Sequence, residues 1–310
     1  MCPAYSRIRN SLDWRPKQGR NKGTAVSSGV STQRESFVAE VADYTGPAVH
    51  ESIAAVIRRA LLTHSIVLIR GMRLTPKEHV GLTRLLGEIE PASDQRNHHP
   101  DSVDILVVHN TGDTPVVGNQ HWHTDRSFHL RPSRYTILYG SLIGSGGGET
   151  LFADMVGAYR QAPAAWKTGL AGAVGVHSYD RLARLRAEVH DQPIQADYAT
   201  LFPPVRHPVV RAHPESGTPA FYLSELCLAR IESEDGTPSD ISVEELHAHA
   251  TQDRFVHRHQ WRTDDVVIWD NARVMHRAAR LPAGAQRVLH RTTTAGDPPR
   301  PAEPMATDGH

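Results

Sequence analysis

Residues 120–125, Gln-His-Trp-His-Thr-Asp, carry the side chains whose types and spacing best suit chemistry. On extended backbone, residues two apart point to the same side, so His123 and Asp125 can aim an imidazole and a carboxylate at one ion. A second histidine from elsewhere in the chain would complete a face of two nitrogens and one oxygen. That donor set suits ferrous iron and leaves positions open for a bidentate ligand and for oxygen.

The triplet His-x-Asp is a weak signal by itself, because a chain with 20 histidines contains such triplets by chance. A second one, His99-Pro100-Asp101, has proline in the middle and is typical of a turn. His121 and His123 also fit a cupin-type metalloenzyme, although no glutamate follows at the usual short distance. On the residues alone, both interpretations of the metal site stay open.

Two arginines in the C-terminal third suit the binding of anions near such a site. Arg287 and Arg291 lie four residues apart on a predicted strand, so they face the same way with backbones about 13 Å apart. That separation indicates two separate anions, a co-substrate and a substrate, rather than one carboxylate held by both. Arginine is suitable because its planar fork matches a carboxylate. His290 alternates with the two arginines and should face the opposite side.

The elements that must position these residues are mostly short strands. Helices are predicted over residues 48–63, from the capping box at Thr75 to about Gly87, at about 156–171 and at 242–252. Strands are predicted at Ser65–Ile69, Val103–Val108, Tyr135–Ile143, Thr150–Ala153, Pro208–Arg211, Ala220–Leu223, Asp265–Trp269 and Arg287–Thr293. Many short strands with few helices indicate a mainly β protein with flanking helices (α+β), built as a barrel or sandwich.

The chain is expected to form one domain over residues 36–297. Residues 1–35 are polar and basic and should be a disordered arm, and the Pro-rich end, 298–310, should be a disordered tail. Residues 177–206 show weak periodicity and are interpreted as a lid over a site. The glycine-rich stretch at 144–148 leads into a strand rather than a helix, so it is interpreted as a turn and not as a phosphate-binding loop.

Composition excludes several kinds of partner. Lys+Arg and Asp+Glu are both 34, so the net charge is zero and a nucleic-acid partner gains no support. No apolar run approaches the roughly 18 residues of a membrane span, and no signal-peptide segment opens the chain. Two cysteines make a disulfide framework implausible and fit a reducing cytoplasm. We expect a cytoplasmic protein that acts on a small molecule, and homo-oligomerisation stays open.

With these motifs in view, the chain resembles the taurine dioxygenase family, which includes the chlorophenoxyacetate dioxygenases. The resemblance covers roughly residues 37–297. The order and spacing of five blocks carry it, and in this sequence they stand at residues 122–125 (Trp-His-Thr-Asp), 147–154 (Gly-Gly-Glu-Thr-Leu-Phe-Ala-Asp), 207–214 (His-Pro-Val-Val-Arg-Ala-His-Pro), 269–271 (Trp-Asp-Asn) and 287–291 (Arg-Val-Leu-His-Arg).

The resemblance implies a double-stranded β-helix (jelly-roll) core and an iron(II)- and 2-oxoglutarate-dependent dioxygenase. It implies that His123, Asp125 and His276 are the catalytic iron ligands and that Thr150 and Arg287 hold the distal carboxylate of 2-oxoglutarate. Oxygen and 2-oxoglutarate are then consumed, succinate and carbon dioxide are released, and a C–H bond of a small anionic molecule is oxidised, most simply by hydroxylation. Such enzymes also serve specialised metabolism.

By the same resemblance, Arg291 matches the residue that binds the substrate's anionic group, and Asn119 lines the substrate pocket. The chain departs from the taurine enzyme before the first ligand, where Asp94 replaces a histidine, and after the ligand Asp125, where Arg126 replaces a valine. We therefore expect a substrate other than taurine, and Arg126 together with Arg291 favours a more highly charged anion.

Halogenating relatives carry a small residue in place of the carboxylate ligand, so the carboxylate of Asp125 favours hydroxylation or a related oxidation. Trp122 and Trp269 flank the ligands and should pack the walls of the site. The alternative from another class is a non-catalytic metal-binding jelly-roll protein that senses a small acid. Succinate release that depends on iron and substrate separates the two hypotheses.

Overall fold

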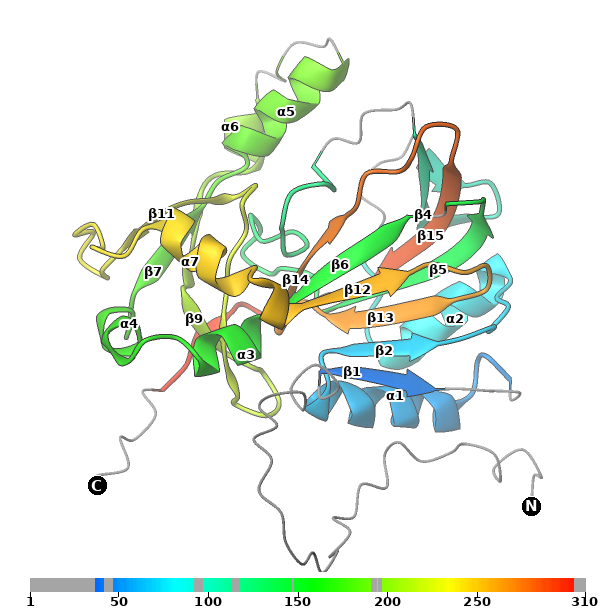
Figure 1. Ribbon diagram of the computed structural model, residues 1–310, viewed down its shortest axis with the longest axis horizontal. Helices are drawn as coiled ribbons and strands as arrows, with labels where there is room; N and C mark the ends of the chain where they lie inside the picture. The colour runs from blue at the N-terminus through cyan, green and yellow to red at the C-terminus, as the bar shows by residue number, and fades with distance from the viewer. Residues whose placement is uncertain are drawn as a thin grey trace, which may run out of the picture.

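The computed structural model describes residues 37–41, 47–91, 97–112, 118–146, 148–190, 194 and 197–303. A seven-stranded sheet and a three-stranded sheet face each other across the centre of the molecule (Figure 1). Two further three-stranded sheets extend the smaller side. The predicted mainly β fold with a jelly-roll core and flanking helices is confirmed.

The large sheet is assembled from strands that lie far apart in the sequence. Its order is β1 (Val38–Val41), β2 (Ile66–Ile69), β13 (Val266–Asp270), β5 (Tyr135–Ile143), β15 (Gln286–Thr293), β4 (Ser102–Thr111) and β3 (His98–His99). Strands β1 and β2 are parallel and are joined across helix α1, whereas the other pairs are antiparallel. Strand β15, which contains Arg287 and Arg291, therefore lies between β4 and β5.

Helices α1 (Glu51–Thr63) and α2 (Pro76–Leu86) cover the outer face of the large sheet (Figure 1). The buried side of α1 follows helical spacing through Ile53, Ile57 and Leu61. Helix α2 begins at the predicted capping box, in which Thr75 and Glu78 each bond the other's backbone N–H. These two helices therefore bury the outward-facing side chains of β1, β2, β5 and β13.

Strand β13 shows why the sheet is apolar on both faces, since all five of its residues are buried. Val266 and Ile268 join the cluster under α1 and α2. Val267 and Trp269 alternate to the inner face, where they meet Phe152 of the smaller sheet. Each fully buried side chain of this size contributes about 1.5–3 kcal/mol, so the two sheets are held together by their inner faces.

The smaller sheet contains β12 (Val256–Gln260), β6 (Glu149–Asp154) and β14 (Val274–Ala278), with β6 in the middle. Helices α3 (Met155–Arg160) and α7 (Val243–Ala250) pack on its far side around Leu151 and Met275. The single helix predicted at 156–171 was wrong. Pro163 interrupts it, and α4 (Ala164–Gly169) begins after that proline, which has no N–H to continue a helix.

The remaining strands form two small sheets beside the core. One contains β11 (Leu228–Glu232), β7 (Val174–His177) and β8 (Val205–Pro208), and the other β10 (Pro219–Phe221), β9 (Val210–Ala212) and β16 (Arg300–Pro301). Because β16 pairs with β9, the expectation of a disordered tail from residue 298 was wrong as far as residue 303. The expected arm, 1–35, and residues 304–310 lie outside the described residues.

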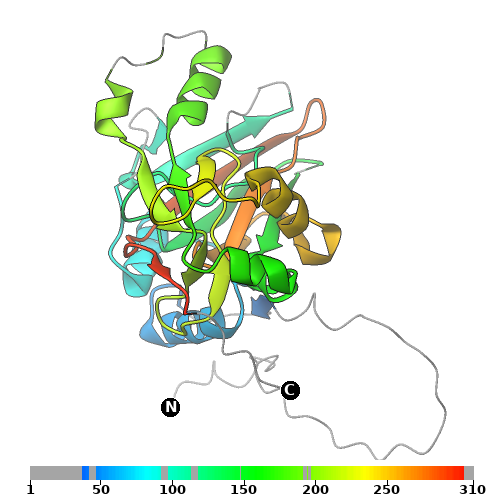
Figure 2. The ribbon, with the colours of Figure 1, turned by 90° about the vertical axis from the view of Figure 1, so that its left-hand side faces the viewer.

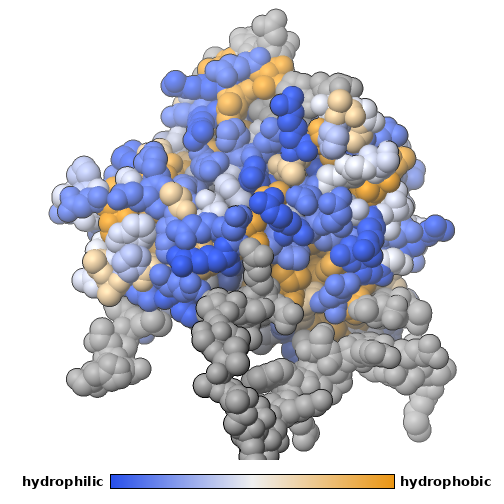
Figure 3. Space-filling model, in the orientation of Figure 1, coloured by the Kyte–Doolittle hydropathy of each residue, from blue (hydrophilic) through white to orange (hydrophobic). Residues whose placement is uncertain are grey.

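The segment expected to be an irregular lid contains two helices. Helices α5 (Asp180–His190) and α6 (Tyr198–Leu201) occupy half of residues 177–206 and project from the body (Figure 2). They rest on an apolar cluster that includes Tyr179, Leu182 and Phe202. Figure 3 shows apolar surface at the end of the molecule where these helices project. Val189 of α5 and Leu201 of α6 are exposed. None of the helices in the described ranges is both long and apolar enough to cross a membrane.

Candidate metal centre

Two of the three predicted ligands are joined through their backbones. His123 and His276 form an isolated antiparallel bridge, with mutual N–H to carbonyl bonds of 3.0 and 2.9 Å. Residues opposite each other in such a bridge present their side chains on the same face, and the ring centroids lie 4.2 Å apart. The fold thus brings together two histidines separated by about half the chain.

The carboxylate of Asp125 completes the group. Its Oδ1 atom lies 3.9 Å from Nε2 of His123 and 3.8 Å from Nε2 of His276. The three ligand atoms all lie within 4.8 Å of one another, and no other group of His, Cys, Asp and Glu side chains in the described part of the chain meets in this way. Two imidazole nitrogens and one carboxylate oxygen at these separations fit a ferrous ion.

The protonation states also suit a metal. His123 Nδ1 lies 2.7 Å from the carbonyl oxygen of His121, so Nδ1 carries the proton and Nε2 has its lone pair free. Burial lowers the pKa of His123 and of His276, which keeps both rings neutral. Burial alone would raise the pKa of Asp125, but the charge of Arg291 and the hydrogen bond from Thr136 oppose it, and that pKa lies below its usual range.

The second oxygen of Asp125 is engaged elsewhere. The hydroxyl of Thr136 on β5 donates to Oδ2 at 2.6 Å, whereas Nη2 of Arg291 contacts Oδ1 at 2.7 Å. Thr136 belongs to the large sheet and His276 to the smaller sheet, so the metal group lies between the two sheets. Thr136 was not recognised in the sequence as a functional residue, although a polar residue within an apolar predicted strand was a usable signal.

Aromatic rings pack against one ligand. The rings of Trp269 and Phe152 lie 4.6 and 6.2 Å from that of His276, centroid to centroid. Trp269 therefore packs the wall of the site, as predicted. Trp122 instead lies in the cluster beneath α3, with the guanidinium of Arg277 5.2 Å from its ring.

Arg287 bonds the backbone of Glu149, the residue that precedes Thr150. Arg287 is 2% exposed, and it donates to the side-chain oxygen of Asn110 at 3.1 Å and to the backbone oxygen of Glu149 at 3.4 Å. Burial lowers its pKa to about 10. The hydroxyl of Thr150 accepts a bond from Nε1 of Trp261 at 2.9 Å. A buried guanidinium among neutral acceptors fits an incoming carboxylate.

The residues predicted to bind substrate do not all lie in one place. Arg291 and Arg126 line one pocket together with Glu90, Pro91, Asp104, Leu106, Thr292 and Thr293. Arg126 has a left-handed φ of 54° and pairs with Glu90 at 3.3 Å, a partner that the sequence did not reveal. The backbone oxygen of Asn119 accepts from Ala278 N at 2.6 Å, which places it beside the His276 strand. Asp94 lies outside the described residues.

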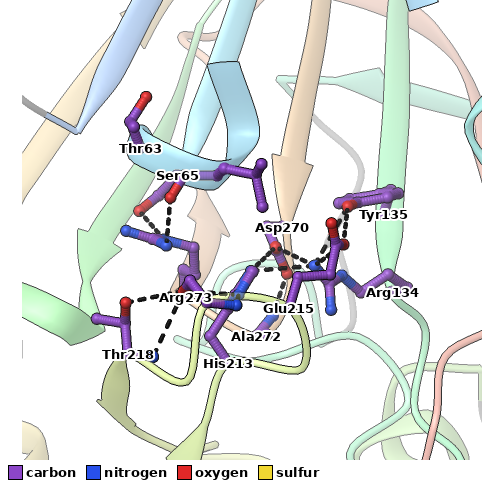
Figure 4. A network of polar contacts seen from close by, with 12 residues as sticks. Thr63, Ser65, Arg134, Tyr135, His213, Glu215, Thr218, Asp270, Ala272 and Arg273 are labelled. Carbon is purple, nitrogen blue, oxygen red and sulfur yellow. Dashed lines mark hydrogen bonds and ion pairs between the residues drawn. The ribbon is translucent and has the colours of Figure 1, made fainter. Parts of the chain in front are cut away.

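A buried network holds the turn that leads into the His276 strand. Figure 4 shows Asp270 between Arg134 and His213, at 3.0 and 2.9 Å. Nδ1 of His213 accepts from Ser216 N, so its Nε2 is the atom that donates to Asp270. Asp270 also accepts from the backbone N–H of Ala272 at 2.8 Å. This network fixes the turn from which Asn271 and then His276 follow.

A jelly roll with two histidines and one carboxylate between its sheets defines a mononuclear non-heme iron enzyme. The chain belongs to the taurine catabolism dioxygenase family (TauD, TfdA family), whose family model matches residues 29–293. It is a 2-oxoglutarate-dependent dioxygenase that uses iron(II), 2-oxoglutarate and oxygen.

Named relatives agree with this class. The alpha-ketoglutarate-dependent 2,4-dichlorophenoxyacetate dioxygenase of Burkholderia sp. (strain RASC) is 31% identical over 247 residues, which cover 75% of this chain and 82% of that protein. Pentalenolactone F synthase of Streptomyces avermitilis is 28% identical over 287 residues, covering 85% and 91%. These relatives support the catalytic interpretation over the non-catalytic sensor.

Solved structures agree as well. A taurine dioxygenase from Burkholderia xenovorans matches with a TM-score of 0.69 at 27% identity, over 87% of this chain and 91% of that one. AAD-2, solved with Mn(II) and N-oxalylglycine, matches with a TM-score of 0.70 at 26% identity, over 86% and 96%.

Proposed function

We propose that this dioxygenase oxidises a C–H bond of a small anionic molecule at an iron held by His123, Asp125 and His276. The observation that carries this assignment is the convergence of those three ligand atoms within 4.8 Å. A carboxylate at position 125 favours hydroxylation or a related oxidation. When bound, iron and 2-oxoglutarate supply the oxidising chemistry, and the protein supplies position and electrostatics.

Thr150 and Arg287 are proposed to hold the distal carboxylate of 2-oxoglutarate. Arg287 is charged, buried and surrounded by neutral oxygen acceptors, so a carboxylate placed there gains a charge-assisted bond out of reach of water. The hydroxyl of Thr150, whose orientation Trp261 restrains, adds a second polar contact. Held at this end, the co-substrate is oriented toward the three ligands.

Arg291 is proposed to bind the anionic group of the substrate. Its guanidinium lies 2.7 Å from Asp125 Oδ1, so an anion held by it would sit next to the metal group. Arg126 shares the pocket but is already paired with Glu90, so its charge is partly offset. Two relatives are named as dioxygenases of 2,4-dichlorophenoxyacetate and of (S)-phenoxypropionate, which are both carboxylates. We infer a carboxylate or similar small anion, with Asn119 and Asp94 as further pocket residues.

The wider setting is also a proposal. A chain with zero net charge fits a cytoplasmic enzyme that needs neither nucleic acid nor membrane, and a symmetric homo-oligomer is compatible with it. Residues 36–297 are proposed to act as one catalytic domain, with α5 and α6 as its lid.

An anaerobic titration with iron(II) and 2-oxoglutarate tests the assignment. The wild type should develop the weak visible charge-transfer band of the chelate, and Asp125→Ala should lose both that band and succinate release with a panel of small anions. Asp101→Ala is the matched control, because it removes the carboxylate of the other His-x-Asp triplet, whose side chain is 77% exposed. An unchanged band in Asp125→Ala would overturn the proposal.

A further inference from the structure

The two oxygens of Asp125 have different neighbours. Oδ1 faces Nε2 of both histidines, at 3.9 and 3.8 Å, and Nη2 of Arg291, at 2.7 Å, whereas Oδ2 accepts the hydroxyl of Thr136 at 2.6 Å. From this difference we propose that Thr136, oriented by Asn271 and Trp269, is a positioning residue that presents Asp125 to the metal through Oδ1 alone. This inference rests on the proposed metal site.

The direction of each hydrogen bond in this group follows from one side chain. Nε1 of Trp269 is only a donor, so the atom of Asn271 that it contacts at 3.1 Å must be the amide oxygen. The amide nitrogen of Asn271 therefore faces Thr136 Oγ1, at 2.9 Å, and donates to it. The assignment of oxygen and nitrogen in this amide thus rests on chemistry.

Because Asn271 donates to the oxygen of Thr136, the hydroxyl hydrogen of Thr136 is free to point at Asp125. The backbone N–H of Asp125 in turn lies 3.4 Å from the amide oxygen of Asn271. Thr136 is directly opposite Trp269 in the β5–β13 register, so two adjacent strands of the large sheet hold the donors in place. Trp269, Asn271 and Thr136 are at most 1% exposed, so bulk water does not compete for these bonds.

The consequence for ligation is a restriction on the carboxylate. An Asp125 whose Oδ2 is engaged by Thr136 would offer a metal ion its Oδ1 atom, which Arg291 also contacts, and with two imidazole nitrogens this would make three protein donors. The remaining positions are then available to a bidentate co-substrate and to oxygen. If Thr136 were absent, the carboxylate could rotate or offer both oxygens, and it would no longer be held in the geometry that faces both rings.

Metal binding by the protein without 2-oxoglutarate tests this role. Free Mn(II) is measured by electron paramagnetic resonance during titration of the apoprotein. Thr136→Val keeps the shape of the side chain but removes the donor, and we expect it to weaken Mn(II) binding about 10–100-fold. Thr136→Ser restores the hydroxyl and should bind within about threefold of wild type, on the same outer-shell scale.

Thr83→Val is the matched control. Thr83 is equally buried, at 0% exposed, and its hydroxyl bonds His79 O at 2.9 Å and Thr292 Oγ1 at 2.6 Å under α2, with no bond to the metal group. Its substitution should lower the unfolding temperature of the apoprotein but leave Mn(II) affinity unchanged. The visible spectrum of the Co(II) form should shift in Thr136→Val and superimpose on wild type in Thr83→Val.

The outcomes separate two failures. Equal Mn(II) affinity in wild type and Thr136→Val, or an equal loss in Thr83→Val, would overturn the role of Thr136 while leaving the metal site intact. Absence of Mn(II) binding by the wild type, or full binding by Asp125→Ala, would instead overturn the proposed metal site. If Thr136→Val does not fold, Asn271→Leu takes its place, since it removes the donor that orients Thr136 and should weaken Mn(II) binding in the same direction.

Discussion

Arg287 is a buried charge that donates to neutral oxygens, those of Asn110 and Glu149. Keeping a charge buried without an opposite charge is unfavourable, and the lowered pKa of Arg287 is the measure of that cost. A carboxylate bound beside it would offset the cost. Arg287 is therefore expected to favour the binding of an anion.

Arg287→Lys should raise KM for 2-oxoglutarate about 10–100-fold, because a lysine cannot reproduce the fork and a charge-assisted bond contributes about 1.5–3 kcal/mol. The turnover number at saturating 2-oxoglutarate should change much less. Steady-state succinate release at varied 2-oxoglutarate checks this. Arg258→Lys is the control: Arg258 is an exposed residue on β12, and its substitution should leave the KM for 2-oxoglutarate unchanged. A fall in turnover with constant KM would argue against the assigned role.

At the scale of elements, the turn between β13 and β14 depends on one carboxylate. Asp270 is fully buried and neutralises Arg134 while it accepts from His213 (Figure 4). Burial alone would raise its pKa, but Arg134 and His213 hold that pKa below the usual range. Because His213 directly follows β9, the same carboxylate connects a small sheet to the turn before His276.

Asp270→Asn should lower the free energy of unfolding by about 3–5 kcal/mol, since breaking a buried ion pair leaves a charge without compensation. Glu215→Gln is the matched control: Glu215 contacts the same Nη2 atom of Arg134 at 3.0 Å, but its side chain is 54% exposed. An exposed pair contributes about 0–1 kcal/mol. Urea unfolding of both variants measures the two losses in the free energy of unfolding. Equal losses would contradict the larger role of the buried Asp270.

At the scale of the whole molecule, the fold buries several histidines in their neutral form. Burial lowers the pKa of His79 to about 3, and it lowers the pKa of both His207 and His290 to about 4. Unfolded histidine titrates near 6.5. Between these values the unfolded chain binds more protons than the folded chain, so stability falls as the pH drops below about 6.5.

His79, which is 1% exposed, should by itself remove about 2 kcal/mol of stability between pH 7 and pH 5. Urea unfolding at the two pH values measures the total loss, which other groups share. His79→Gln should be less stable at pH 7 but should lose about 2 kcal/mol less on acidification. A variant that loses as much as wild type would show that His79 is protonated in the folded protein.

Some features could be predicted from the sequence because their signals are local. The capping boxes, the strand Tyr135–Ile143 and the opposite facing of Arg291 and His290 follow from patterns within a few residues. Pro163 was an equally local signal for the break between α3 and α4, and it was missed. The helical character of α5 was not visible, since its apolar residues face only a small cluster.

The sequence by itself determined the donor types and the class of chemistry, because ligand identity and the spacing of His123 and Asp125 are properties of the chain. Only the tertiary structure decided that His276 meets them and that Thr136, Asn110 and Glu90 become the partners of Asp125, Arg287 and Arg126. The physical reason is that these contacts depend on strand register and sheet order. Register and order are set by the packing of whole sheets and are not encoded in any short segment.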